Sequence, residues 1–283
     1  MFIWLASYPK SGNTWLRSML AAYFFSNTGI YNFDLITNIK QFPETGLFKN
    51  LGINTDNEQE VIKNYIKVQE KFNNKQSIQF LKTHSYLFNI NNNVFTNLKN
   101  SIGAIYIVRD PRNVVTSWAN FTNTSIENAT DVLIKNYKFG GDKNTTNETD
   151  TTVFVGTWRQ NYNSWKSFKH QQRYLLIKYE DLINNRDISL HKMLKFIHEL
   201  NGTKLKIDQK KFAKVVETTS FERMKNLERT KGFFEAKFDL KTGKKIPFFN
   251  LGEKNDWKKL LNVKIVNKIE KSFKDEMMEL GYL

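Results

Sequence analysis

The 283-residue sequence contains no cysteine. This absence excludes a disulfide framework, a thiolate metal site and a cysteine nucleophile. Long apolar runs are also missing, since no stretch approaches the roughly 18 residues of a membrane-spanning helix. The apolar run at residues 2–6 has no basic segment before it and is shorter than the apolar core of an export signal. We therefore expect a soluble, cytoplasmic protein without a membrane span.

Acidic residues are few relative to basic ones, with 28 Asp and Glu against 43 Lys and Arg, and the formal net charge is +15. Such a charge suits an anionic ligand, a nucleic acid or an acidic surface, but it does not indicate a fold. The lysines are scattered and the basic runs are short, which fits a general enrichment in Lys and Asn equally well. Net charge alone therefore leaves the partner open.

The composition is that of an ordinary globular protein, with 40% apolar and 25% charged residues. A chain of this length forms one α/β domain by default, so we expect residues 1–283 to be a single domain. Residues 120–152 are rich in Asn, Thr, Asp and Gly, and they predict a surface excursion or lid with one weakly helical island. A second irregular stretch covers residues 225–256.

Short apolar runs predict the buried strands of a parallel sheet at residues 2–6, 78–81, 102–108 and 174–177. Amphipathic stretches separate these runs, and the first of them should begin near Asn13 or Thr14. Further helices are expected at residues 58–72, 114–119, 158–168, 188–200, 209–216 and 263–280. The alternation of strands and helices predicts a three-layer α/β/α domain with a central, mainly parallel sheet.

Each predicted strand runs into a polar cluster. The clusters are residues 7–12, 82–84, 109–112 and 179–181. In open parallel sheets, ligands bind outside the carboxyl ends of the strands. We therefore expect these four distant segments to converge on one crevice.

Residues 8–15 read Tyr-Pro-Lys-Ser-Gly-Asn-Thr-Trp and connect the first strand to the first helix. Gly12 allows a tight turn, and the start of the helix offers unpaired N–H groups with the positive end of its dipole. The loop also carries charged, hydroxyl and aromatic side chains suited to an anionic ester with a base: Lys10, Ser11, Thr14 and Trp15. Because Lys10 precedes the only glycine of the loop by two positions, the loop differs from that of nucleoside triphosphatases.

This octapeptide resembles the 5′-phosphosulfate loop of the cytosolic-type sulfotransferases that use 3′-phosphoadenosine 5′-phosphosulfate, although Asn13 stands where many members have Thr. Residues 109–117, Arg-Asp-Pro-Arg-Asn-Val-Val-Thr-Ser, look like the 3′-phosphate motif of that family. The resemblance implies that Arg109 and Ser117 bind the 3′-phosphate. A guanidinium suits this role because it donates forked hydrogen bonds to phosphate.

Residues 82–84, Lys-Thr-His, are similar to the active-site triplet of the family. The resemblance implies that His84 takes the proton of an acceptor hydroxyl or amine, Lys82 contacts the sulfuryl group, and Lys10 stabilises the leaving oxygen. A neutral imidazole that titrates near physiological pH suits a general base. The other three histidines lie outside any motif and show no metal-ligand spacing, so no metal is predicted.

The resemblance also implies which residues bind the nucleotide. In the first loop these are Lys10, Ser11, Gly12, Asn13, Thr14 and Trp15. Around the adenine and near the C-terminal motif they are Tyr179, Thr219, Ser220, Phe221, Met224 and Gly252. Taken singly, the Tyr179 and 219–224 patterns equally suit a strand-end aromatic residue and an ordinary helix start.

The C-terminal motif departs from the family pattern. The family usually has Arg-Lys-Gly-x-x-Gly-Asp-Trp, whereas residues 250–257 read Asn-Leu-Gly-Glu-Lys-Asn-Asp-Trp. Gly252 keeps the frame, but Asn250 and Leu251 replace the basic pair that would clamp the 3′-phosphate. This departure predicts weaker donor binding or a changed nucleotide, unless a neighbouring lysine supplies the charge: Lys244, Lys245 or Lys254.

The sequence thus favours a sulfotransferase that converts 3′-phosphoadenosine 5′-phosphosulfate to adenosine 3′,5′-bisphosphate. A nucleotide or small-molecule kinase is one alternative, against which the missing Gly-Lys-Ser/Thr loop counts. A non-catalytic binder of an anionic polymer is another, but no nucleic-acid module is present and no nucleic-acid partner is expected.

The sequence does not identify the acceptor, which we expect to be a small molecule or a glycan. Residues 30–57 and 120–152 are expected to line its site. The many aromatic residues could line an apolar acceptor pocket, but we favour the interpretation that the phenylalanines lie in the core and on the surface. The oligomeric state is not indicated.

Overall fold

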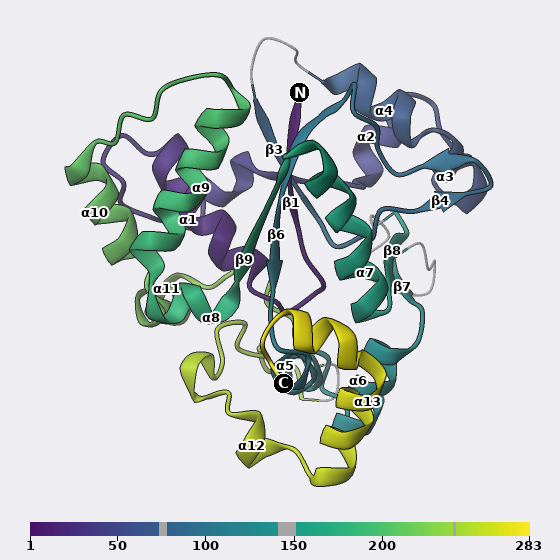
Figure 1. The fold of residues 1–283 in the computed structure, drawn as a ribbon, viewed down its shortest axis with the longest axis vertical. Helices are drawn as coiled ribbons and strands as arrows, with labels where there is room; N and C mark the ends of the chain where they lie inside the picture. The colour runs from purple at the N-terminus through teal and green to yellow at the C-terminus, as the bar shows by residue number, and fades with distance from the viewer. Residues whose placement is uncertain (74–77, 141–150, 240–241) are drawn as a thin grey trace.

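The computed structural model describes residues 1–73, 78–140, 151–239 and 242–283. Within these residues the central sheet is parallel, with the strand order β2-β3-β1-β6-β9 (Figure 1). Its strands are β1 (Phe2–Ala6), β2 (Lys40–Gln41), β3 (Gln79–Thr83), β6 (Ser101–Val108) and β9 (Tyr174–Lys178). The chain therefore begins in the middle of the sheet and adds strands on both sides of β1.

The two faces of the sheet carry separate hydrophobic cores. Successive side chains of a strand point to opposite faces, and in β1 Trp4 joins one core while Ile3 and Leu5 join the other. Both β1 and β6 are buried along their whole length. This burial explains why these strands are continuous apolar runs rather than alternating ones.

Helices cover both faces (Figure 1). One core receives α1 (Asn13–Phe25), α8 (Tyr179–Asn184), α9 (Arg186–Leu200), α10 (Gln209–Thr218) and α11 (Phe221–Lys231). The other receives α2 (Thr45–Lys49), α3 (Glu58–Lys63), α4 (Tyr65–Phe72), α5 (Pro111–Thr122), α6 (Ile126–Ile134), α7 (Trp158–Trp165) and α13 (Val263–Glu279). The predicted three-layer α/β/α architecture is confirmed.

Short elements complete the described chain. They are the 3₁₀ turns η1 (Leu35–Asn38), η2 (Lys166–Gln171) and η3 (Gly252–Lys254), helix α12 (Trp257–Leu260), and the antiparallel pairs β4 (Asn89–Ile90) with β5 (Asn93–Val94) and β7 (Tyr137–Phe139) with β8 (Val153–Gly156). Among the described residues, none of the helices has both the length and the apolar character that crossing a bilayer requires.

The predicted strands are found, and their ends move by two residues at most. The short strands β2, β4, β5, β7 and β8 were not predicted. The helix expected at residues 58–72 is two helices, α3 and α4, because Asn64 between them has φ −104° and ψ 4°. Its side-chain amide donates to the Glu60 carbonyl at 2.8 Å, a local bond that competes with the helical pattern.

Other helix boundaries also differ from the predicted ones. Helix α5 begins at Pro111 rather than at residue 114, because the Asp110 side chain caps it and proline suits the first helical position. The helix predicted at residues 158–168 ends at Trp165 and continues as the 3₁₀ turn η2.

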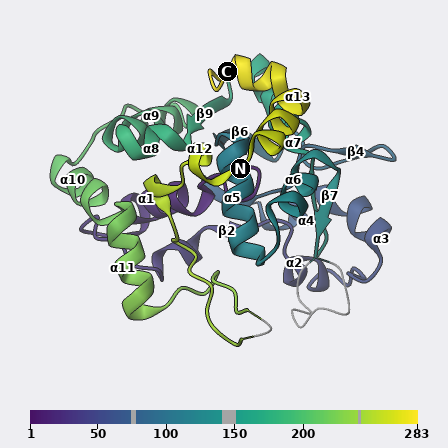
Figure 2. The same ribbon diagram turned by 90° about the horizontal axis from the view of Figure 1, so that it is seen from below.

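The described part of the predicted lid, residues 120–140 and 151–152, contains the end of α5, all of α6 and strand β7. The predicted helical island is α6, which begins at the capping residue Ser125 and buries Ala129 and Leu133. Helix α6 contacts both α5 and α13 (Figures 1 and 2). Residues 141–150 of the predicted lid lie outside the described residues.

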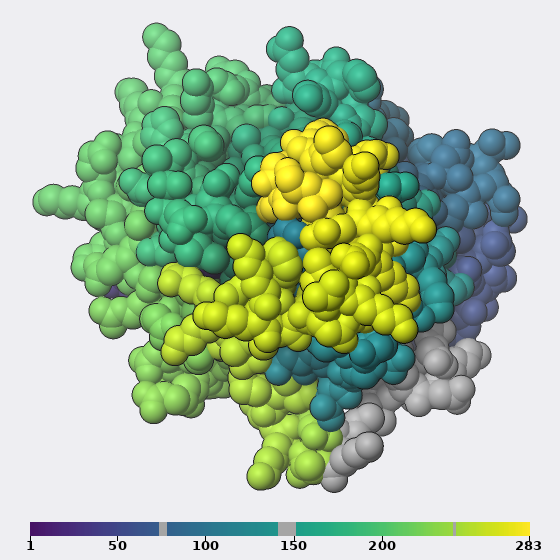
Figure 3. All heavy atoms as spheres, turned by 60° about the horizontal axis from the view of Figure 1, so that its bottom comes forward, coloured from purple at the N-terminus to yellow at the C-terminus, as the bar shows by residue number. Residues whose placement is uncertain are grey.

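Arg112 joins the start of α5 to the C-terminal segment. This segment, yellow in Figure 3, lies over the middle of the face of the molecule shown there. Its guanidinium pairs with Asp110 at 2.6 Å and with Glu270 at 2.5 Å. It also donates to the Tyr282 carbonyl at 2.8 Å and lies 3.9 Å from the ring centre of Trp257. The Arg112 side chain is only 6% exposed, so these partners supply most of its interactions.

We expect the substitution Arg112→Ala to lower the free energy of unfolding by about 3 kcal/mol, because it leaves a buried carboxylate without its counter-ion. Urea unfolding would measure the loss. Arg223→Ala is the matched control, since this arginine is exposed and its pair with Glu217 is 3.7 Å long; its removal should change stability by less than about 0.5 kcal/mol. Equal losses for the two variants would contradict this account of Arg112.

Candidate active site

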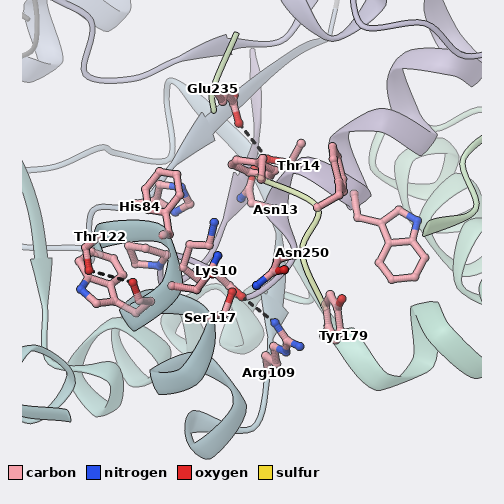
Figure 4. A pocket seen from close by; sticks show the side chains of 18 of the residues that line it. Lys10, Asn13, Thr14, His84, Arg109, Ser117, Thr122, Tyr179, Glu235 and Asn250 are labelled. Atoms are coloured by element: carbon pink, nitrogen blue, oxygen red, sulfur yellow. Dashed lines mark hydrogen bonds between the residues drawn. The ribbon is translucent and has the colours of Figure 1, made fainter. Parts of the chain in front are cut away.

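A cavity of about 440 Å³ lies at the carboxyl ends of the central strands. Its wall includes Lys10 after β1, Lys82 and His84 at the end of β3, Arg109 after β6 and Tyr179 after β9. Figure 4 shows Lys10, His84, Arg109 and Tyr179 gathered from separate elements. The four polar segments predicted to converge therefore do so.

The loop between β1 and α1 contains two residues with left-handed backbones, Lys10 at φ 65° and Gly12 at φ 101°. A Cβ atom on Gly12 would lie 2.5 Å from the Tyr179 ring, so this position has no room for a side chain. Gly12 is also the residue before α1, and no side chain caps that helix. The first N–H groups of α1 are thus available to an anion.

Buried donors beside the loop suit an anionic ligand. The Ser11 hydroxyl and the Arg109 Nε are buried and have no hydrogen-bond partner among the described residues. The Arg109 guanidinium lies 3.9 Å from the ring centre of Tyr179, and its Nη1 donates to the Lys10 carbonyl at 3.3 Å. Unpaired buried donors cost free energy, which a ligand with oxygen acceptors would recover.

His84 is held with one ring nitrogen committed. Its Nδ1 lies 2.9 Å from the Ser7 carbonyl oxygen and 3.2 Å from the Ser7 hydroxyl. A carbonyl only accepts, so Nδ1 carries the proton and Nε2 keeps its lone pair. Burial, with a further contribution from Lys82, lowers the pKa of His84 to about 3. The imidazole is therefore neutral at physiological pH with its lone pair on Nε2, but its pKa lies far below the near-physiological value expected from the sequence, because burial disfavours the charged form.

Hydrogen bonds connect His84 to the loop between β1 and α1 and to helix α7. The Asn13 amide donates to the Leu5 carbonyl at 2.9 Å and to the Ser7 hydroxyl at 3.2 Å. The Asn161 amide donates to the His84 carbonyl at 2.8 Å. Asn13, which stands where the resembled family often has Thr, thus supports the residue that orients the imidazole.

Lys10 points between two aromatic rings. Its Nζ lies 3.8 Å from the ring centre of Phe121 and 4.1 Å from that of Phe248. Burial lowers the pKa of Lys10 to about 7; Glu235 opposes this shift, whereas Arg109 and other nearby cations add to it. An anion bound beside Lys10 would raise this pKa again and keep the amine charged.

Glu235 is a site residue that the sequence did not predict. One oxygen lies 2.6 Å from Arg17 and 3.7 Å from Lys82, and the other accepts the Thr14 hydroxyl at 3.0 Å. Burial alone would raise the pKa of Glu235, but Arg17 and Lys82 outweigh it and hold that pKa far below its usual range. Glu235 lies in an irregular segment 221 positions after Thr14, so no local pattern marks it.

The predicted nucleotide-binding residues divide into two groups. Those that line the cavity are Lys10, Gly12, Asn13, Thr14, Trp15, Arg109, Ser117, Tyr179, Phe221 and Gly252. Three of these residues form an aromatic cluster: the ring centre of Trp15 lies 5.5 Å from that of Tyr179 and 5.9 Å from that of Phe221. A Cβ atom on Gly252 would lie 2.4 Å from the Phe221 ring, which explains why glycine occupies this position.

The other group does not line the cavity described here: Ser11, Thr219, Ser220 and Met224. The Thr219 hydroxyl donates to the Val215 carbonyl at 2.6 Å, while its own carbonyl accepts the Trp15 indole N–H at 2.7 Å. Ser220 caps α11, and Met224 is fully buried in the core. Of these four residues, Thr219 thus holds Trp15 of the aromatic cluster in place from outside the cavity.

Residues 250–252 line the cavity beside Arg109 and Ser117, without the basic pair of the resembled family. Asn255, at the position of its second glycine, accepts the Thr116 hydroxyl at 2.6 Å and donates to the Asn113 carbonyl at 3.0 Å. The amide thus fastens this segment to α5. The lysines considered as substitutes for the basic pair do not line the described cavity: Lys244, Lys245 and Lys254.

The remaining wall is strongly aromatic, with Trp118, Phe121, Tyr137, Phe139 and Phe248. Some phenylalanines thus line the cavity, which agrees with the alternative of an apolar acceptor pocket, whereas others, such as Phe42 and Phe95, lie in the core. The described part of residues 120–152 contributes to this wall as predicted, whereas residues 30–57 contribute Gln41. Within the described residues, no group of three or more His, Asp or Glu is placed to hold a metal ion.

Comparison with known proteins gives consistent results. The family model "Sulfotransferase domain" matches residues 2–281. Rat sulfotransferase 1A1 is 24% identical over 266 residues, which cover 92% of this chain and 78% of that protein. Mouse sulfotransferase 1 family member D1 is 23% identical over 282 residues, covering 97% of this chain and 83% of that protein.

Solved structures share the fold. The crystal structure of mouse SULT7A1 complexed with PAP aligns with a TM-score of 0.57 and 18% identity, over 98% of this chain and 84% of that one. Retinol dehydratase in a complex with retinol and PAP aligns with a TM-score of 0.61 and 16% identity, over 98% and 81% of the two chains.

We expect Lys82→Met to raise the pKa of His84 above its value of about 3, because the substitution removes a nearby positive charge that opposes imidazolium formation. Proton–carbon NMR of the imidazole during an acid titration would measure the shift. The exposed Lys169 provides the control substitution, Lys169→Met, which should leave the titration unchanged. The same His84 pKa in both variants would show that Lys82 does not act on the imidazole.

Proposed function

The chain belongs to the sulfotransferase domain family, and from this membership we propose how its cavity carries out sulfuryl transfer. The protein is an enzyme that transfers a sulfuryl group from 3′-phosphoadenosine 5′-phosphosulfate to a small-molecule acceptor. PAP, adenosine 3′,5′-bisphosphate, is the nucleotide named for the mouse SULT7A1 and retinol dehydratase structures, and we infer that this chain releases the same product.

We assign the roles of the site residues from one observation: a base, His84, and an anion-binding loop, residues 8–15, lie in the same cavity. The loop of Gly12 and the imidazole of His84 belong to one cavity, and Nε2 keeps its lone pair. The buried Nε of Arg109 lacks a hydrogen-bond partner among the described residues, which suits a ligand rich in phosphate oxygens. We therefore assign the phosphosulfate to the loop and the 3′-phosphate to Arg109 and Ser117.

In the proposed reaction the acceptor oxygen forms a bond to sulfur as its proton passes to Nε2 of His84. The bond between sulfur and the bridging oxygen breaks, and its electron pair stays on the departing phosphate. Lys82 stabilises the sulfuryl oxygens and Lys10 the bridging oxygen. Such electrostatic contributions amount to about 3 kcal/mol each in a water-excluded site.

The acceptor end of the cavity suits an apolar molecule with a hydroxyl or amine group. The rings of Trp118, Phe121, Tyr137 and Phe139 can bury a flat hydrocarbon body, which favours a phenol or a hydrophobic alcohol over a glycan.

We also propose that residues 1–283 act as one catalytic domain, since one hydrophobic core contains both Phe2 and Leu280. A cytoplasmic location agrees with the cytosolic-type sulfotransferases that the loop resembles.

The test of the base is His84→Ala. Turnover of radiolabelled phosphosulfate with a panel of phenols, alcohols, sugars and amines should fall by about 10³-fold, which is typical for a lost general base. Calorimetric binding of adenosine 3′,5′-bisphosphate should stay near the wild-type value. His170→Ala, at an exposed histidine, should change neither quantity. If His84→Ala kept wild-type turnover, the base assignment would be wrong.

We expect Asn250→Arg to tighten the binding of adenosine 3′,5′-bisphosphate by about tenfold, because a guanidinium beside Arg109 and Ser117 would add a charge-assisted bond to the 3′-phosphate. Adenosine 5′-monophosphate, which lacks that phosphate, should gain less. Isothermal calorimetry with both nucleotides would separate the two effects. Asn201→Arg adds the same charge at an exposed position after α9 and serves as the control. If Asn250→Arg increased the affinity for both nucleotides equally, the 3′-phosphate would not bind beside residue 250.

A further inference from the structure

Glu235 is the one carboxylate in the cavity wall of the described residues. Its side chain is 19% exposed and contacts two cations and a hydroxyl group. The hydroxyl belongs to Thr14, in the first turn of α1, where the proposed function expects the phosphosulfate. A carboxylate thus occupies part of a site whose ligand is itself an anion.

The Thr14 hydroxyl has a single proton to donate. It gives this proton to Glu235 Oε2 at 3.0 Å, and its oxygen accepts from Arg17 Nη2 at 3.2 Å. While the bond to Glu235 persists, Thr14 cannot donate to a phosphate oxygen. The ligand and Glu235 therefore compete for the same hydrogen bond.

Lys82 is subject to the same competition. Its Nζ lies 3.7 Å from Glu235 Oε1, whereas the proposed reaction needs its charge at the sulfuryl oxygens. A carboxylate beside a cation reduces the attraction of that cation for another anion. Glu235 therefore weakens a second contact of the donor.

Arg17 keeps the carboxylate near the site. Its guanidinium is 3% exposed and lies 2.6 Å from Glu235 Oε1, and a buried guanidinium requires such a counter-ion. Phe233, two residues before Glu235, anchors the segment, because its ring centre lies 4.4 Å from that of Phe33 and 4.9 Å from that of Phe248. Oε1 can stay on Arg17 while Oε2 turns away from Thr14.

We propose that Glu235 is a built-in anion that competes with the donor for Thr14 and Lys82 and so sets the donor affinity. When the donor binds, Oε2 releases the Thr14 hydroxyl while Oε1 remains on Arg17. This inference rests on the proposed function, because it assumes that the donor reaches the first turn of α1.

The substitution Glu235→Gln tests the competition with little change of shape. The glutamine oxygen can keep the bond from Arg17, while its NH₂ group donates to the Thr14 oxygen and frees the Thr14 proton. Calorimetry with adenosine 3′,5′-bisphosphate should therefore give binding about tenfold tighter than wild type, the value of one hydrogen bond. Glu253→Gln removes the same charge from η3, next to the cavity-lining Gly252, without touching Thr14 or Lys82, and it should tighten binding much less.

Thr14→Val provides the second variant, alone and combined with Glu235→Gln. Alone it should change the affinity little, because the wild-type complex gains a bond from Thr14 to the ligand only by losing the bond to Glu235. In the Glu235→Gln background it should abolish most of the tenfold gain. The two substitutions are therefore expected to be strongly coupled.

Other results would overturn the inference. Weaker binding by Glu235→Gln would mean that Glu235 positions Thr14 and Lys82 for the donor. If Glu253→Gln tightened binding of the bisphosphate as much as Glu235→Gln does, the effect would be one of net charge. If the effects of Thr14→Val and Glu235→Gln on the affinity were additive, Glu235 and the donor would not compete for the Thr14 proton. If Glu235→Gln did not fold, a large loss of affinity in Thr14→Val alone would refute the competition. If wild type itself failed to bind the bisphosphate, the proposed function would fail first.

Discussion

The structure depends on the close gathering of positive charges at the carboxyl edge of a parallel sheet. Lys10, Lys82 and Arg109 come from three different strand ends and enter one buried space. Like charges in such a space repel each other and lose hydration. The packing around them must therefore be rigid, and the contacts of Gly12 with Tyr179 and of Lys10 with Phe121 are part of that packing.

The parts of the site that follow from local sequence were predicted, and the parts that depend on distant contacts were not. The strands, the loop at residues 8–15 and the pair Arg109 and Ser117 each lie in a continuous motif, and the sheet brings these motifs together. Glu235 has no motif and reaches Thr14 across 221 positions. Asn255 reaches Thr116 across 139 positions, and strand β2 is too short to leave a periodic pattern.

The aromatic residues show why composition alone was a poor guide to function. Phe42 and Phe95 fill the core, as ordinary burial predicts, whereas Phe121 and Phe248 hold an ammonium group in the cavity. Both uses need the same residue type, although Phe42 and Phe95 are fully buried and Phe121 and Phe248 only partly, so the residue type alone does not distinguish them. The difference arises only when the chain places a lysine between two of the rings.

The contacts of Arg112 impose an order on the assembly of the site during synthesis. A ribosome makes the loop at residues 8–15 long before it makes Glu270 and Tyr282, yet these late residues fix the turn that carries Arg109. A nascent chain that lacks them has the loop at residues 8–15 but not the partners of Arg112 beside the proposed 3′-phosphate site. The proposed nucleotide site is therefore completed late in translation, after the last strand of the central sheet.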